Sequence, residues 1–141
     1  MAQFLDARVS QNATSTNSIS IPIPVINTPT LFAQIGLLTA GAGPNPRVQI
    51  KGTITVQLPL ALFIVTITIV RGTVATDPII YSASTTYGLS GIIAPEVITF
   101  SANDFNPPIT PQLTYSAFIS TNLLGTVRVG PENLDGFLVS D

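Results

Sequence analysis

The 141-residue sequence contains no cysteine, no histidine and no tryptophan. The first two absences exclude a disulfide framework, Cys-His and Ser-His-Asp nucleophilic sites, and most transition-metal sites. Charge is also scarce, because charged residues make up 9% of the chain, against roughly 25% in an ordinary soluble domain. Its four arginines and single lysine are scattered and form no basic patch, so we expect no nucleic-acid partner.

Segments that would interact with a membrane are missing as well. The most apolar run, residues 58–70, is too short for a spanning helix and contains two threonines. No polybasic or amphipathic helical segment is present, so we expect no membrane insertion. The first residues, MAQFLDARVSQ, have neither the basic n-region nor the apolar h-region of a secretory signal peptide, and we expect none there.

The residues that are abundant favour sheet over helix. Residues 48–58 alternate without a break, with apolar side chains such as Val48 and Ile50 on one face and polar ones such as Gln49 on the other. This pattern predicts a half-buried strand. Residues 63–70 are apolar or β-branched on both faces, which predicts a central strand with both sides covered.

Other short alternating segments follow one another along the chain, separated by Pro- and Gly-containing turns. We predict strands at 1–10, 19–26, 31–39, 79–87, 96–102, 112–121, 125–129 and 134–139, and turns or loops at 76–78, 88–95, 103–111 and 130–133. The alternate prolines of 19–26 place that strand at a sheet edge. The pattern is typical of an all-β fold, a single jelly-roll or β-sandwich domain over residues 19–141 with an N-terminal extension.

The N-terminal extension, residues 1–18, is a strand followed by a polar linker, residues 10–18. An isolated strand is not stable, and nine extended residues reach about 30 Å. The strand therefore either folds back on its own domain or pairs with a neighbouring subunit. We expect the second, with Leu5, Ala7 and Val9 buried in the neighbour and Phe4 at the mouth of the interface.

The last residues, 133–139, read Asn-Leu-Asp-Gly-Phe-Leu-Val. This stretch resembles the final strand of complement-head and tumour-necrosis-factor-like jelly rolls, which end in a Ser/Asp-x-Phe-Ser-Gly-Phe-Leu run. Bacterial proteins of this kind, cysteine-poor and rich in Thr, Ile and Val, occur on the spore surface of bacilli. Some polymerise into endospore appendages through an N-terminal arm. The resemblance thus implies an exosporium or appendage subunit.

Few residues suggest a chemical site. Glu132 and Asp135 could bind Ca²⁺ through oxygen ligands, but we favour a solvated turn, since Ca²⁺ takes six or more such ligands; Asn103-Asp104 is a weaker candidate. Asn12-Ala13-Thr14 matches the glycosylation pattern, which we attribute to chance. Lys51, the only lysine, could form an isopeptide bond, although a solvated side chain is the simpler interpretation.

The aromatic side chains have two interpretations. The three tyrosines, Tyr81, Tyr87 and Tyr115, could form a sugar-binding platform. Packing in the core or an interface is the interpretation we favour, because many aromatic residues lie in strand patterns. The phenylalanines expected in the core are Phe63, Phe100, Phe118 and Phe137.

We therefore expect a structural, self-assembling subunit of an extracellular or spore-surface fibre or layer, whose partners are copies of itself. Strand donation to the next copy is a head-to-tail contact and propagates into a filament. A trimeric complement-head-like binding module is one alternative, and a viral capsid or decoration protein is another. An enzyme is the least favoured class, because only scattered carboxylates and hydroxyls are available. We expect no catalytic residue, no cofactor and no metal.

Overall fold

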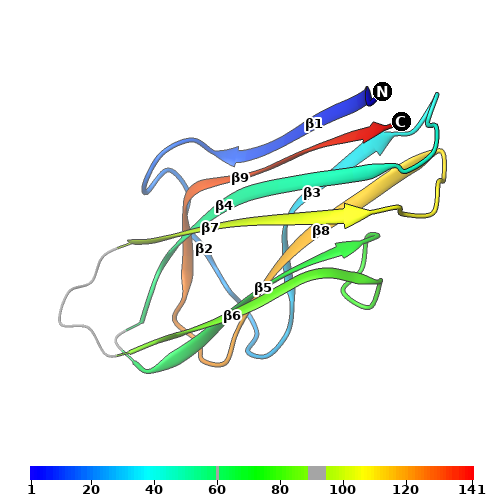
Figure 1. Ribbon diagram of the computed structural model, residues 1–141. Coiled ribbons are helices and arrows are strands. Elements are labelled where there is room, and N and C mark those ends of the chain that lie inside the picture. Colours follow the sequence, from blue (N-terminus) through cyan, green and yellow to red (C-terminus); the bar gives the residue numbers. More distant parts are fainter. Residues whose placement is uncertain (60, 89–94) are drawn as a thin grey trace.

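The structure is a computed structural model that describes residues 1–59, 61–88 and 95–141. These residues form strands and no helix (Figure 1), so none of them provides the long apolar helix that a bilayer crossing needs. The all-β prediction is confirmed. The strands are β1 (Gln3–Ala13), β2 (Ile21–Pro22), β3 (Thr30–Leu38), β4 (Arg47–Gln57), β5 (Phe63–Arg71), β6 (Ile79–Tyr87), β7 (Pro95–Phe105), β8 (Gln112–Thr121) and β9 (Val127–Ser140).

The strands form two antiparallel sheets that pack face to face. The first sheet has the order β1-β9-β4-β7, with the short β2 also pairing with β9, and the second has the order β3-β8-β5-β6. Apart from β2, each sheet thus contains four strands, which is the eight-stranded architecture of a jelly roll. The predicted β-sandwich is confirmed, and Figure 1 shows the two chain termini side by side at one end of the first sheet.

The two most strongly patterned segments lie in opposite sheets. β4 runs between β9 and β7, and β5 runs between β8 and β6, so both are central strands. The prediction that both faces of β5 are covered is only partly correct, because on the outer face Val70 is buried whereas Ile64, at the other end, is exposed. The outer-face hydroxyl groups of Thr66 and Thr68 lie 2.8 and 3.4 Å from serine hydroxyls of β6. These hydrogen bonds satisfy the threonine hydroxyls on the outer face of the sheet.

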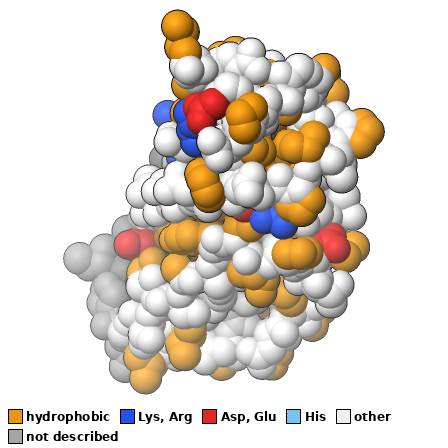
Figure 2. All heavy atoms as spheres, turned by 45° about the vertical axis from the view of Figure 1, so that its right-hand side comes forward, with side chains coloured by type: hydrophobic (Ala, Val, Ile, Leu, Met, Phe, Trp, Pro, Cys, Tyr) orange, Lys and Arg blue, Asp and Glu red, His pale blue; other side chains and the backbone are white. Residues whose placement is uncertain are grey.

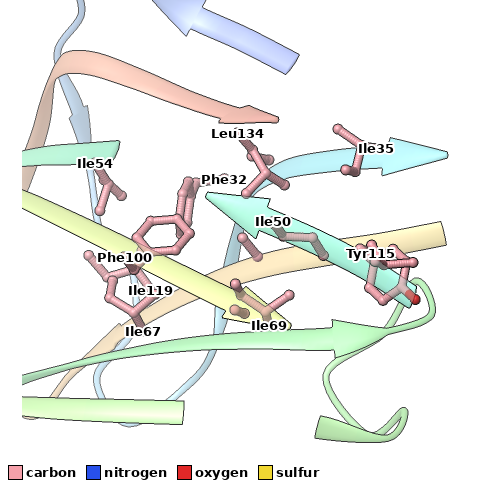
Figure 3. Close-up of a cluster of buried hydrophobic side chains, with 14 of the residues drawn as sticks. Phe32, Ile35, Ile50, Ile54, Ile67, Ile69, Phe100, Tyr115, Ile119 and Leu134 are labelled. Atoms are coloured by element: carbon pink, nitrogen blue, oxygen red, sulfur yellow. The ribbon is translucent and has the colours of Figure 1, made fainter. Parts of the chain in front are cut away.

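The core lies between the inner faces of the sheets. Figure 3 shows the side chains of both sheets pointing toward one another, including Ile50 and Leu134 from the first sheet and Ile69 from the second. Phe32 of the second sheet contacts Phe100 of the first edge-on, with ring centroids 6.0 Å apart. Burying a large apolar side chain of this kind stabilises the fold by about 1.5–3 kcal/mol.

Three strands continue through residues that the sequence pattern assigned to loops. β1 extends to Ala13, into the expected linker, and β7 extends to Phe105, into the expected loop at 103–111. β9 runs through the turn predicted at 130–133. In each case polar side chains that suggested a loop have partners on other strands. Most of the loop predicted at 88–95 lies outside the described residues.

Candidate functional site: the N-terminal strand and its groove

Strand β1 occupies one edge of the first sheet and pairs antiparallel with β9 of its own chain. The register aligns Phe4 with Val139, Ala7 with Phe137 and Val9 with Asp135. It is interrupted by two irregularities, one between Phe4 and Asp6 and one between Gln11 and Ala13. Residues 3–13 therefore belong to the first sheet in this structure.

The four residues expected at a subunit interface differ in burial. Phe4 and Val9 are 64% and 74% exposed, and Ala7 is also exposed. Only Leu5 packs against the core. The apolar side chains thus contribute little to holding β1 on its own sheet, and Phe4 and Val9 remain available for contacts with another molecule.

Polar side chains attach β1 to the opposite sheet. The amide of Gln3 donates to the carbonyl of Gly41 at 2.8 Å, and the carboxylate of Asp6 accepts from the main-chain N–H of Leu38 at 2.8 Å. The amide of Asn12 donates to the carbonyl of Phe32. Sequence patterning missed these contacts, because the partners of all three side chains are main-chain groups of β3 and the turn after it.

Asp6 is also bonded within its own strand. Its carboxylate accepts from the N–H of Ala7 and from Nε of Arg8, both at 2.9 Å. The bond from the Leu38 N–H, followed by the bond from Arg8, lowers the pKa of Asp6 below its ordinary value of 3.8. The carboxylate is therefore ionised, and its bond to β3 is intact, at neutral pH.

The segment that leaves β1 is a compact turn. The N–H of Ser18 donates to the carbonyl of Ser15 at 3.2 Å, and Asn17 has a φ of 61°. Gly130 of β9 lies against this turn with a φ of +87°, and a Cβ there would approach Ser15 O to 2.8 Å. Residues 14–18 thus form a short polar connection at the bend of β9, in the place where a hinge for β1 would have to be.

A buried ion pair stabilises the bend of β9. Arg128 donates from Nε to Glu132 Oε2 at 2.9 Å and from Nη2 to Oε1, and the Glu132 side chain is fully buried. Asn12 of β1 donates to the same Oε1 at 2.8 Å. The prediction of a solvated turn at Glu132 is therefore wrong, because the carboxylate has enough buried donors to stay within the strand.

The same geometry argues against the Ca²⁺ alternative. Glu132 lies on the buried side of β9, whereas Asp135 pairs by register with Val9 and Lys51 on the outer face. Residues that are an odd number of positions apart, such as 132 and 135, point to opposite faces of a strand. Within the described ranges, no group of three or more acidic residues is placed to hold a metal ion.

A second buried polar cluster links the two sheets. Arg71 of β5 makes two 2.7 Å bonds to the carboxylate of Asp104 of β7, which also accepts from the Tyr115 hydroxyl of β8 at 2.7 Å. Burial, followed by the bond to Asp104, raises the pKa of Tyr115 well above its ordinary value. Figure 3 shows the Tyr115 oxygen at the edge of the core. Asp104 is thus a structural residue and not a loop ligand.

The remaining candidates have separate positions. Tyr115 is buried, Tyr87 stacks on Phe63 and Tyr81 packs near Phe100, so the three tyrosines form no common exposed platform. Core positions are confirmed for Phe63 and Phe100, and Phe118 is buried too.

Phe137 and Lys51 lie on the outer face of the first sheet. The core prediction for Phe137 is wrong: it is 37% exposed, because its position in β9 points to the outer face. Lys51 is exposed on the same face, and within the described part of the chain it forms no ion pair. The solvated interpretation of Lys51 agrees with this position.

The surface contains little charge. Figure 2 shows hydrophobic side chains dispersed over a mostly uncharged polar surface, with few acidic or basic groups. The fold and the site together define a jelly-roll β-sandwich in which an N-terminal strand completes one sheet. Hydrophobic side chains of that strand lie exposed on its outer face.

Comparisons with known proteins give a distant structural neighbour and no sequence relative. No protein-family model matches the sequence, and no curated protein matches it. The chain is similar to one in the structure of infectious bursal disease virus, Gt strain, with 9% sequence identity and a TM-score of 0.31. The match covers 95% of this chain and 36% of the viral one, so this chain spans about a third of the viral chain's length.

Proposed function

We propose that this protein is a structural subunit that assembles with copies of itself by donating strand β1 to the groove of a neighbour. One observation carries the proposal. The chain connects β1, a complete strand of the sandwich, to the next strand only through residues 14–20, and the β1 side chains Phe4 and Val9 are exposed. Strand exchange replaces each intramolecular contact with the same contact between copies, so it costs little and needs no new surface.

The surface composition supports self-assembly. One row across the outer face of the first sheet has an exposed phenylalanine at each end, Phe4 and Phe105, with half-buried Val139 and Arg47 between them by register. Phe105 is 68% exposed. With a formal net charge of −2, little electrostatic repulsion opposes close approach of copies.

The setting of this assembly is a further part of the proposal. We propose a fibre or layer on a bacillus spore as that setting, on the ground that residues 133–139 resemble the final strand of spore-surface jelly rolls. A structural role also requires no catalysis, and we propose no enzymatic activity.

Paired cysteine substitutions at register partners test strand donation directly. Val9→Cys combined with Asp135→Cys places two thiols opposite each other on β1 and β9, and the chain has no other cysteine. Donation predicts a ladder of covalent oligomers after oxidation of assembled protein, resolved on a non-reducing gel and abolished by reductant. Each single-cysteine variant is the control and should give no ladder.

Other outcomes contradict the proposal. If the assembled protein gives only an internally crosslinked monomer, β1 folds back in every copy and another surface mediates assembly. If electron microscopy and light scattering show a monomer under all conditions, the protein does not self-assemble. A single closed trimer without interchain disulfides would favour the binding-module alternative.

A further inference from the structure

Strand β1 closes two sheet edges at once. Its backbone pairs with β9 of the first sheet, and its side chains bond to β3, the edge strand of the second sheet. In the described residues β3 has a strand partner only on its β8 side. β1 therefore lies in a groove between β9 and β3. β9 pairs with the main chain of β1, whereas β3 and the turn after it offer individual main-chain donors and acceptors to side chains of β1.

The contacts with β3 follow a constant register. Gln3 bonds to Gly41, Asp6 to Leu38 and Asn12 to Phe32, and the two residue numbers of every pair add up to 44. A constant sum is the signature of two antiparallel segments in a single alignment. Side chains of β1 thus bond to main-chain groups of β3 and the turn after it, as the backbone of a neighbouring strand would do.

The irregularities of the strands direct these side chains. Asn12 is the residue of β1 that the β9 register skips, and Phe32 is the residue of β3 that the β8 register skips. Asp6 directly follows the other skipped residue of β1. Because a bulge re-aims the side chains around it, two bulges that meet at Asn12 and Phe32 define one position along the groove.

Among the apolar residues of β1, only Leu5, which packs against the core, and the small buried Ala13 favour one alignment. Ala7, Val9 and Gln11 follow one another on the outer face, and all three are exposed. On the outer face, a slip of β1 by two residues would exchange these side chains without exposing or burying any large apolar surface. The polar bonds to β3, in contrast, would all be lost in such a slip.

We propose that Gln3, Asp6 and Asn12, the register triad, determine where β1 docks in the groove between β9 and β3 of a second copy. The inference rests on the proposed strand donation for the identity of the second copy. The triad makes docking specific, because each side chain requires a main-chain partner at one position. An arm lacking the triad would bind in several registers and produce irregular assemblies.

Crosslinking in two registers tests the inference in the full-length chain. Val9→Cys is combined either with Asp135→Cys, its native partner, or with Phe137→Cys, its partner after a two-residue slip. Each pair is made in the wild-type background and with Gln3→Ala plus Asp6→Ala. The ratio of the two disulfide yields is measured at an early oxidation time on non-reducing gels.

We expect the native pair to dominate in the wild-type background. Loss of Gln3 and Asp6 should shift the ratio toward the slipped pair by at least about fivefold, which corresponds to the loss of one or two hydrogen bonds. Gln11→Ala is the matched control, because it removes an exposed polar side chain of the same strand and should leave the ratio unchanged. Asn12→Ala should shift the ratio in the same direction.

The size of the crosslinked product separates this inference from the proposed function. An unchanged ratio in the Gln3→Ala plus Asp6→Ala background overturns the register triad, whether the products are monomers or ladders. A shifted ratio with only internally crosslinked monomers supports the triad as a determinant of register and overturns strand donation.

Discussion

At the scale of single residues, two oppositely charged side chains are buried together in this sandwich. Glu132 and Arg128 lie four residues apart on β9 and neutralise each other inside the protein. Removing one member of a buried pair leaves an uncompensated charge, which is far more destabilising than replacing both with apolar residues. The pair therefore sets a strong constraint on the bend of β9.

Substitution of Glu132 tests this constraint. Glu132→Ala should lower the free energy of unfolding by about 3–5 kcal/mol, because Arg128 remains buried without its partner. The combination of Arg128→Met with Glu132→Leu should recover most of that loss. Asp135→Ala is the control on the outer face, expected within about 0.5 kcal/mol of wild type. Equilibrium denaturation measures all three, and a small effect of Glu132→Ala would show that the carboxylate is not buried in solution.

At the scale of elements, β1 is the strand whose attachment depends on polar contacts. Most of its hydrophobic side chains are exposed, so its stability depends on pairing with β9 and on bonds such as the one from the Leu38 N–H to Asp6. Asp6 has a folded-state pKa below its ordinary value of 3.8. Its stabilising contribution is therefore fully present well above pH 3.8 and is lost as the pH falls through the lowered folded-state value.

Acid should consequently loosen β1 before it unfolds the sandwich. Amide hydrogen exchange of residues 3–13 should accelerate as the pH falls below about 4, after correction for the intrinsic rate, while β4 and β5 stay protected. Asp6→Asn should exchange faster at neutral pH and lose this acid dependence. Asp141, whose pKa is also lowered, by its bonds to Asn45 and Arg47, titrates in the same range. Acid dependence that persists in Asp6→Asn would assign the effect to Asp141 or to another carboxylate.

At the scale of the whole molecule, two packed sheets supply the stability, and no metal or disulfide is needed to explain it. The core contains side chains from both sheets, and the cluster of Arg71, Asp104 and Tyr115 ties them together at one end. A domain of this length can bury a sufficient core without covalent staples.

A chelator should therefore leave the protein unchanged. We expect EDTA to alter neither the melting temperature nor the assembled state, because the described acidic residues form no metal-binding group and Glu132 is bonded to Arg128 and Asn12. Differential scanning calorimetry and light scattering with and without EDTA measure both properties. A large drop in melting temperature would contradict this expectation and would point to a bound cation that stabilises the fold.

The sequence by itself determined the fold class and the positions of most strands. Alternation over 48–58 and 112–121 depends only on which faces are apolar, and a period of two requires a sheet in any tertiary context. The prolines of 19–26 likewise restrict that segment to an edge, and within the described residues β2 pairs only with β9. Local pattern is sufficient wherever one face of a strand is buried and the other is wet.

Only the tertiary structure decided the fate of the polar residues. Asn12, Asp104 and Glu132 lie in stretches that read as loops, yet each is inside a strand. Each bonds to a side chain from a distant part of the chain: Asn12 and Glu132 to each other, and Asp104 to Arg71. The partners of Asp104, for example, lie on β5 and β8, and no local pattern predicts which strands meet across the sandwich. A buried carboxylate is tolerated only where such partners converge, and convergence is a property of the fold and not of any segment.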